Sequence, residues 1–166
     1  DVKISFDEWN VWYHNRKQDA ERMRTWDWPE APRLLEDIYN FEDVLQVGCI
    51  LNTFIRHSDV VRIACIAQLV NVIAPIMTEP GGPAWRQTIY WPFMLASKNG
   101  RGTALRLAVD VPSYDAAAAD EVPWLDIAGT HDSDRGTLTF FAINRHASEA
   151  IEAAVSLEGF KAKAVE

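Results

Sequence analysis

A helix pattern flanked by two strand patterns constrains the fold of this chain more than any other feature. Residues 42–57 carry apolar side chains at steps of three and four, which predicts an amphipathic helix. Asn40 and Asp43 resemble a capping box at its start. Residues 3–9 alternate as a strand does, and residues 60–67 form the mostly apolar run of a parallel strand buried on both faces. Together they predict a βαβ unit. The apolar helix positions are Val44, Val47, Ile50, Leu51, Phe54 and Ile55.

The first predicted strand ends on a carboxylate surrounded by aromatic residues. Glu8 is followed closely by Trp9, Asn10 and Trp12. Aromatic walls with a few convergent polar groups suit a sugar or another hydroxylated ligand. A surface Asp-Glu pair beside core tryptophans explains the same residues, and residue types alone do not decide between the two interpretations.

A polar residue, Gln68, also ends the second predicted strand. Parallel strands of one barrel open on the same face, so we expect Glu8 and Gln68 to lie close together. A glutamine can both donate to and accept from a sugar hydroxyl, whereas the alternative is a buried amide that caps backbone groups. The long polar stretch 10–32 is expected to be a loop on that face, where barrel active sites are built.

Helical patterning gives way to strand patterning near residues 100–102. A helix is predicted over residues 85–97, opened by Pro83, bent at Pro92 and stopped by a left-handed Gly100. Apolar and polar residues then alternate, which predicts antiparallel strands. These strands are expected at residues 104–111, 137–144 and 151–157.

Two stretches between these strands are predicted to be connections. Residues 114–120 are alanine-rich and acidic, which favours a loop, and Asp132 to Gly136 has the residues of a hairpin turn. A calcium loop is the weaker interpretation of this turn, because the distal glutamate ligand is absent.

Charge and composition exclude several classes of partner. A formal net charge of -8 leaves no basic stripe for nucleic acid or an anionic membrane, and no apolar run is long enough to suggest a membrane span. Cys49 and Cys65 lack CxxC spacing and are expected to be reduced core thiols of a cytoplasmic protein. The four histidines show no metal-ligand spacing, so we expect neither a metal nor a cofactor.

The residues from Ser5 to Tyr13, Ser-Phe-Asp-Glu-Trp-Asn-Val-Trp-Tyr, resemble the segment around the catalytic nucleophile of α-L-arabinofuranosidases of glycoside hydrolase family 51. The resemblance continues in the family's order, strongly over roughly the first hundred residues and only in pattern beyond them. The further matching stretches are residues 35–37, 43–45, 63–76 and 85–90.

The resemblance implies a fold of the α/β plus all-β class. Residues 1–101 would be the last strands and helices of a (β/α)8 TIM barrel, and residues 102–166 part of an antiparallel, jelly-roll-like β-sandwich. It also implies that the chain is the C-terminal part of a longer enzyme that forms a homo-oligomer. The missing N-terminal barrel portion of that enzyme would be the partner of this chain.

The mechanism implied is retaining hydrolysis that releases terminal α-L-arabinofuranosyl residues from oligosaccharides of the arabinan or arabinoxylan type. Glu8 would be the nucleophile, and a glutamate outside this sequence the acid/base, so the chain alone is expected to be inactive. Gln68 would contact sugar hydroxyls, and Trp12 and Asn10 would line the pocket. A non-catalytic carbohydrate-binding or interaction fragment is the alternative, distinguished by whether a partner segment supplies the second carboxylate.

Overall fold

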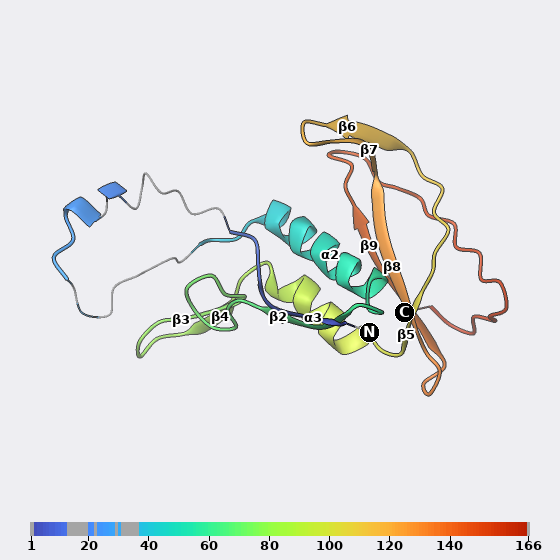
Figure 1. Ribbon diagram of the computed structural model, residues 1–166, viewed down its shortest axis with the longest axis horizontal. Helices are drawn as coiled ribbons and strands as arrows, with labels where there is room; N and C mark the ends of the chain where they lie inside the picture. Colours follow the sequence, from blue (N-terminus) through green and yellow to red (C-terminus); the bar gives the residue numbers. More distant parts are fainter. Residues whose placement is uncertain (1, 13–19, 22, 29, 31–36, 166) are drawn as a thin grey trace.

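The computed structural model describes residues 2–12, 20–21, 23–28, 30 and 37–165. Two helices, α2 and α3, lie between a parallel pair of strands and a group of antiparallel strands (Figure 1). Within the described residues the sheets are small, with two or three strands each. The fold is therefore mixed α/β with small antiparallel sheets. Residues 13–19, 22, 29, 31 and 32 of the predicted loop 10–32 lie outside the described residues.

The predicted βαβ unit is confirmed. Strand β1 (Ile4–Trp9) pairs in parallel with β2 (Val61–Ile66), and helix α2 (Phe41–Arg56) connects them. The capping box is present: the Asn40 side chain accepts from the N–H groups of Glu42 and Asp43, and the Asp43 carboxylate accepts from the Asn40 N–H. These bonds satisfy N–H groups that the first turn leaves without helical partners, which is why the helix begins here.

The core lies between β1 and the two helices. Val47 of α2 and Ile89, just before α3, are fully buried. Trp9 stacks edge-on against Phe54 of α2 and lies near Phe93 of α3. The apolar stripe of α2 thus packs against the strand face that carries Trp9, as the periodicity of the stripe requires. The buried members of this cluster are Trp9, Val11, Tyr39, Val47 and Ile89.

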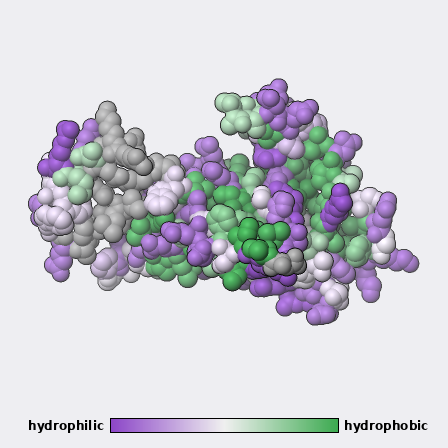
Figure 2. Space-filling model, viewed as in Figure 1, coloured by the Kyte–Doolittle hydropathy of each residue, from purple (hydrophilic) through white to green (hydrophobic). Residues whose placement is uncertain are grey.

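Strand β2 is open on one face, so the prediction that it is buried on both faces is wrong for the described chain. Ala64 and Ile66 pack against the core, whereas Ile63 and Cys65 point the other way and are exposed. A continuous apolar run signals two covered faces, but the described elements cover only the helix side. Hydrophobic side chains reach the surface in the region of β1, β2 and α3 (Figure 2).

The predicted start of the second helix near Pro83 is also wrong. Strand β3 (Ile76–Thr78) pairs antiparallel with β4 (Ala84–Arg86). The turn residues between them close a hairpin, in which the Glu79 N–H donates to Pro83 O and Gly81 adopts a positive φ of 67°. Proline and glycine occur both in hairpin turns and at helix starts. Here the pairing of β3 with β4 makes this stretch a hairpin.

Helix α3 (Tyr90–Asn99) begins after this hairpin. Pro92 lies in its first turn, where a missing N–H removes no helical hydrogen bond, so the predicted bend is unnecessary. Gly100 caps the helix through its N–H to Ala96 O, but with a φ of -74° it is not left-handed as predicted.

The rest of the described chain is antiparallel. Strand β8 (Leu125–Asp132) pairs with β9 (Thr137–Asn144) on one side and with β5 (Thr103–Leu105) on the other. The predicted strand 137–144 is confirmed, as is the turn before it. Asp132 Oδ1 accepts from the N–H groups of Asp134 and Arg135, and Gly136 supplies the positive φ of 63°.

Three predictions in this region are corrected. Residues 114–120 are not a loop but part of a hairpin, β6 (Ser113–Ala116) and β7 (Ala119–Pro123). The predicted strand 104–111 pairs only as far as Leu105, and no strand forms over residues 151–157. Leu105 and Leu107 are half-buried, whereas Val109 is 48% exposed, so the alternation beyond Leu105 corresponds neither to pairing nor to a continuous buried face.

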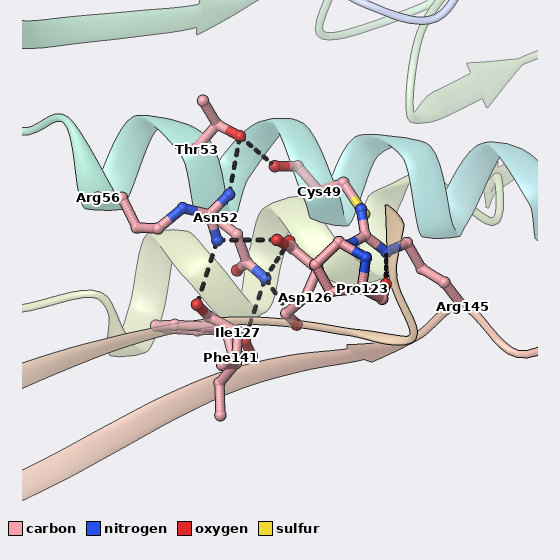
Figure 3. A network of polar contacts seen from close by, with 9 residues as sticks. All are labelled: Cys49, Asn52, Thr53, Arg56, Pro123, Asp126, Ile127, Phe141 and Arg145. Atoms are coloured by element: carbon pink, nitrogen blue, oxygen red, sulfur yellow. Dashed lines mark hydrogen bonds and ion pairs between the residues drawn. The ribbon is translucent and has the colours of Figure 1, made fainter. Parts of the chain in front are cut away.

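A polar network joins α2 to this sheet (Figure 3). The Asp126 carboxylate of β8 accepts from the Asn52 amide at 2.9 Å and from the Arg56 guanidinium at 2.8 Å. The Asn52 amide also donates to Phe141 O of β9, at 3.1 Å. Asn52 is only 1% exposed, so its polar groups need these partners. Helix α2 thus contacts both the parallel strands and the antiparallel sheet.

Candidate active site

The carboxyl ends of β1 and β2 lie next to each other, as parallel pairing predicts. Trp9 pairs with Ile66, and the Ala67 N–H donates to Trp9 O at 3.0 Å. Glu8 immediately precedes this paired point and Gln68 immediately follows it. The structure therefore brings the two predicted site residues to the same end of the same strand pair.

A β-bulge interrupts β1 between Phe6 and Trp9, the stretch that contains Glu8. Phe6 pairs with Ala64 but Trp9 pairs with Ile66, so β1 uses one residue more than β2 between these points. Phe6 and Trp9 consequently both contact Phe54, with ring centroids 5.3 and 5.2 Å apart, although a regular strand would turn them to opposite faces. Bulges commonly redirect side chains at functional sites.

Glu8 is exposed. Its neighbour Trp9 is 7% exposed and points into the core, and adjacent strand side chains point to opposite sides. In the bulge, Asp7 and Glu8 together lie opposite Cys65 of β2, whose side chain is exposed. An exposed carboxylate at a strand end can reach a ligand without a large desolvation penalty.

Two further predicted site residues, Gln68 and Trp12, are also exposed. Trp12, at 58% exposure, lies three positions beyond the end of β1. Gln68 presents an amide that can donate and accept.

Asn10 differs from the other three, because its amide is used within the chain. Its Nδ2 donates to Ala67 O at 2.9 Å, to Tyr39 Oη at 3.2 Å and to Ile73 O, while its Oδ1 accepts from the Val11 N–H at 2.8 Å. Asn10 therefore ties the end of β1 to the end of β2.

Two buried residues that sequence analysis missed complete this cluster. Tyr39 is 4% exposed, and its hydroxyl lies 3.1 Å from Val11 O and 3.3 Å from Ile73 O. Gln87 is 8% exposed; its Oε1 accepts from the Tyr39 N–H, and its Nε2 donates to Asp37 O and Ala74 O. No sequence pattern marks these residues, since their partners are backbone carbonyls from distant segments.

Other features lie away from this face. A hollow of about 640 Å3 opens between the end of α2 and the antiparallel sheet, and its lining residues include Arg56, Arg145 and Asp126 but none of the four predicted site residues. The described residues contain no group of three acidic, histidine or cysteine side chains suited to a metal ion. No helix among them is long and apolar enough to cross a bilayer.

Comparison with known proteins identifies the family. The family model described as the alpha-L-arabinofuranosidase C-terminal domain matches residues 7–166. A solved family 51 alpha-L-arabinofuranosidase from Bifidobacterium longum superposes with a TM-score of 0.81 at 41% identity, covering 90% of this chain and 30% of that one. The chain belongs to the family 51 α-L-arabinofuranosidases. The resemblance found in the sequence is thus confirmed.

Other α-L-arabinofuranosidases align with nearly the whole chain. An intracellular exo-alpha-(1->5)-L-arabinofuranosidase from Halalkalibacterium halodurans is 51% identical over 160 residues, 96% of this chain and 31% of its own. An exo-alpha-(1->6)-L-arabinofuranosidase from Bifidobacterium longum is 46% identical over 168 residues, 100% of this chain and 32% of its own. The chain therefore spans about a third of the length of these relatives and corresponds to a portion of such an enzyme.

Proposed function

We propose that this chain carries the nucleophile of a retaining α-L-arabinofuranosidase that releases terminal arabinofuranosyl residues from oligosaccharides of the arabinan or arabinoxylan type. The observation that supports the proposal is the exposed Glu8 carboxylate in the bulged stretch near the carboxyl end of β1, beside the end of β2. Active sites of parallel barrels are built at this end of the strands. Membership of family 51 supplies the substrate class.

Glu8 attacks the anomeric carbon and forms a glycosyl-enzyme, and a second carboxylate protonates the leaving oxygen and then activates water. Retention requires the two carboxyl groups to stand about 5 to 5.5 Å apart. We assign the second carboxylate to the part of the enzyme outside these 166 residues. The isolated chain is accordingly inactive.

Gln68 and Trp12 contact the sugar in this proposal, and Asn10 borders the pocket at the base of β1. A glutamine amide matches hydroxyl groups, and an exposed indole suits the apolar face of a sugar ring. The enzyme needs no metal or cofactor and acts on a neutral oligosaccharide rather than on nucleic acid or membrane. We place it in the cytoplasm, by analogy with relatives named intracellular. We further propose that the enzyme is a homo-oligomer.

The decisive experiment replaces Glu8 in the full-length enzyme. Glu8→Ala is expected to lower hydrolysis of an aryl α-L-arabinofuranoside by orders of magnitude while the melting temperature is preserved, because a pocket carboxylate is held for chemistry. Added azide should then attack from the vacated side and yield a β-configured arabinofuranosyl azide.

Glu152→Ala, which removes an exposed carboxylate far along the chain, is the matched control and should keep full activity. An α-configured azide product would make Glu8 the acid/base instead. Undiminished activity of Glu8→Ala would remove Glu8 from catalysis and favour a non-catalytic role for this segment.

A further inference from the structure

We infer that Asn10 and Tyr39 are positioning residues that set the orientation of Gln68 relative to Glu8. The inference rests on the proposed function, because it assigns Gln68 to the sugar. It concerns the buried polar cluster beneath the two strand ends. The names of the similar proteins assign no role to this cluster.

The peptide unit that leads into Gln68 is held from β1. The Ala67 N–H donates to Trp9 O at 3.0 Å, and Ala67 O accepts from Asn10 Nδ2 at 2.9 Å. That carbonyl belongs to the same peptide unit as the backbone nitrogen of Gln68. Asn10 therefore fixes the plane from which the Gln68 side chain starts, and it does so from two positions beyond Glu8.

Tyr39 in turn fixes the Asn10 amide. A terminal amide torsion has a broad energy profile, so its orientation depends on hydrogen-bond partners. The Tyr39 hydroxyl accepts from Asn10 Nδ2 at 3.2 Å while it faces Val11 O and Ile73 O. Because Tyr39 is 4% exposed, water cannot readily replace this hydroxyl.

Gln87 anchors the backbone on which Tyr39 stands. Its Oε1 accepts from the Tyr39 N–H at 3.2 Å, and its Nε2 donates to Asp37 O at 3.1 Å and Ala74 O at 2.8 Å. The segment ending at Tyr39 and the loop after β2 are thereby joined to each other. A change at Gln87 should therefore reach the site through Tyr39 and through the loop after β2, where Ile73 O accepts from Asn10 Nδ2.

A double-mutant cycle in the full-length enzyme tests the inference. Tyr39→Phe removes one oxygen atom and should lower kcat/KM on an aryl α-L-arabinofuranoside about tenfold, with the melting temperature within a few degrees of wild type. Gln68→Ala should lower kcat/KM by a similar or larger factor. In the Gln68→Ala background, Tyr39→Phe should cause no further fall, because Tyr39 acts through Gln68.

The inference would be overturned if the two substitutions lowered kcat/KM by independent factors that multiply in the double mutant. Unchanged kinetics of Tyr39→Phe would also overturn it. Tyr114→Phe, at an exposed tyrosine in β6, is the matched control and should behave as wild type. If Tyr39→Phe gives no folded enzyme, Gln87→Met serves instead, with a smaller fall that also vanishes in the Gln68→Ala background. The proposed function is tested separately, by comparing the turnover of the wild-type enzyme with that of Glu8→Ala.

Discussion

Cys49 lies on the side of α2 that faces the sheet. Burial, with help from the Asp126 carboxylate, raises the pKa of the Cys49 thiol from 9.0 to about 11. The nearby Arg145 and Arg56 guanidinium groups lower this pKa, so burial and the carboxylate outweigh them. Cys49 is therefore a neutral packing residue rather than a reactive thiolate.

This pKa predicts a stability change at alkaline pH. The folded protein binds the thiol proton more tightly than the unfolded chain, so the stabilisation is complete below about pH 9 and is lost as pH rises toward about 11. Melting temperatures measured between pH 8 and pH 10.5 should fall less steeply for Cys49→Ala than for wild type. Parallel curves for the two proteins would show that Cys49 does not contribute.

Sequence reasoning placed Glu8 and Gln68 correctly at adjoining strand ends, because each lies where a strand pattern stops. It did not find Tyr39 or Gln87. Their side chains bind carbonyls of Val11, Ile73 and Ala74, and such pairings exist only after distant segments have packed. Roles that depend on backbone partners leave no signature in residue type or spacing.

At the scale of elements, Gly102 controls the entry into β5. It has a φ of 82°, and a Cβ added there would lie 2.0 Å from His131 O and 2.7 Å from the Asp132 Cα. These are backbone atoms of β8, the strand that pairs with β5, so they cannot move aside without breaking the sheet. The close approach and the left-handed conformation both require glycine here.

Gly102→Ala is therefore expected to destabilise the protein by about 3 kcal/mol or more, the sum of backbone strain and overpacking. Denaturant unfolding measures this loss. Gly136→Ala is a matched control: its φ of 63° carries similar strain, but nothing lies within 4 Å of the added Cβ. It should lose only about 1 kcal/mol. Equal losses at the two glycines would show that the contact with β8 is unimportant.

Elements whose signals are local were predictable, and those decided by a partner were not. Helix α2 combines a periodic stripe with a capping box, and β9 combines alternation with a turn at its start, so both were placed well. Strand β4 carries a signal that also fits a helix start, and only its pairing with β3 makes it a strand. Strand β8 lacks a clear alternation and was missed; it forms between two partners.

At the scale of the whole molecule, α2 connects the parallel strands with the antiparallel sheet through Asp126 (Figure 3). Asp126→Ala would leave the buried Asn52 amide and the Arg56 guanidinium without their carboxylate. We expect a loss of about 2 kcal/mol, because the buried Asn52 amide loses an acceptor whereas the exposed Arg56 guanidinium can turn to water. Thermal unfolding of the full-length enzyme followed by circular dichroism measures it.

Asp126→Asn retains an acceptor for Asn52 but not the charge, so it should lie between wild type and Asp126→Ala. Activity of the folded fraction should be unchanged in both, because the network does not include the four predicted site residues. A melting temperature equal to that of wild type in Asp126→Ala would contradict a structural role for the network.

The same network has a consequence for joining segments of two related enzymes. Asn52 and Arg56 precede the residues where the chain turns from helical to strand patterning, and Asp126 follows them. A chimaera that joins residues 1–101 of one relative to the following residues of another brings together side chains of different ancestry at this contact. It retains the contact only if the incoming segment carries a carboxylate at the position of Asp126. A chimaera without that carboxylate is therefore expected to unfold at a lower temperature than either parent enzyme.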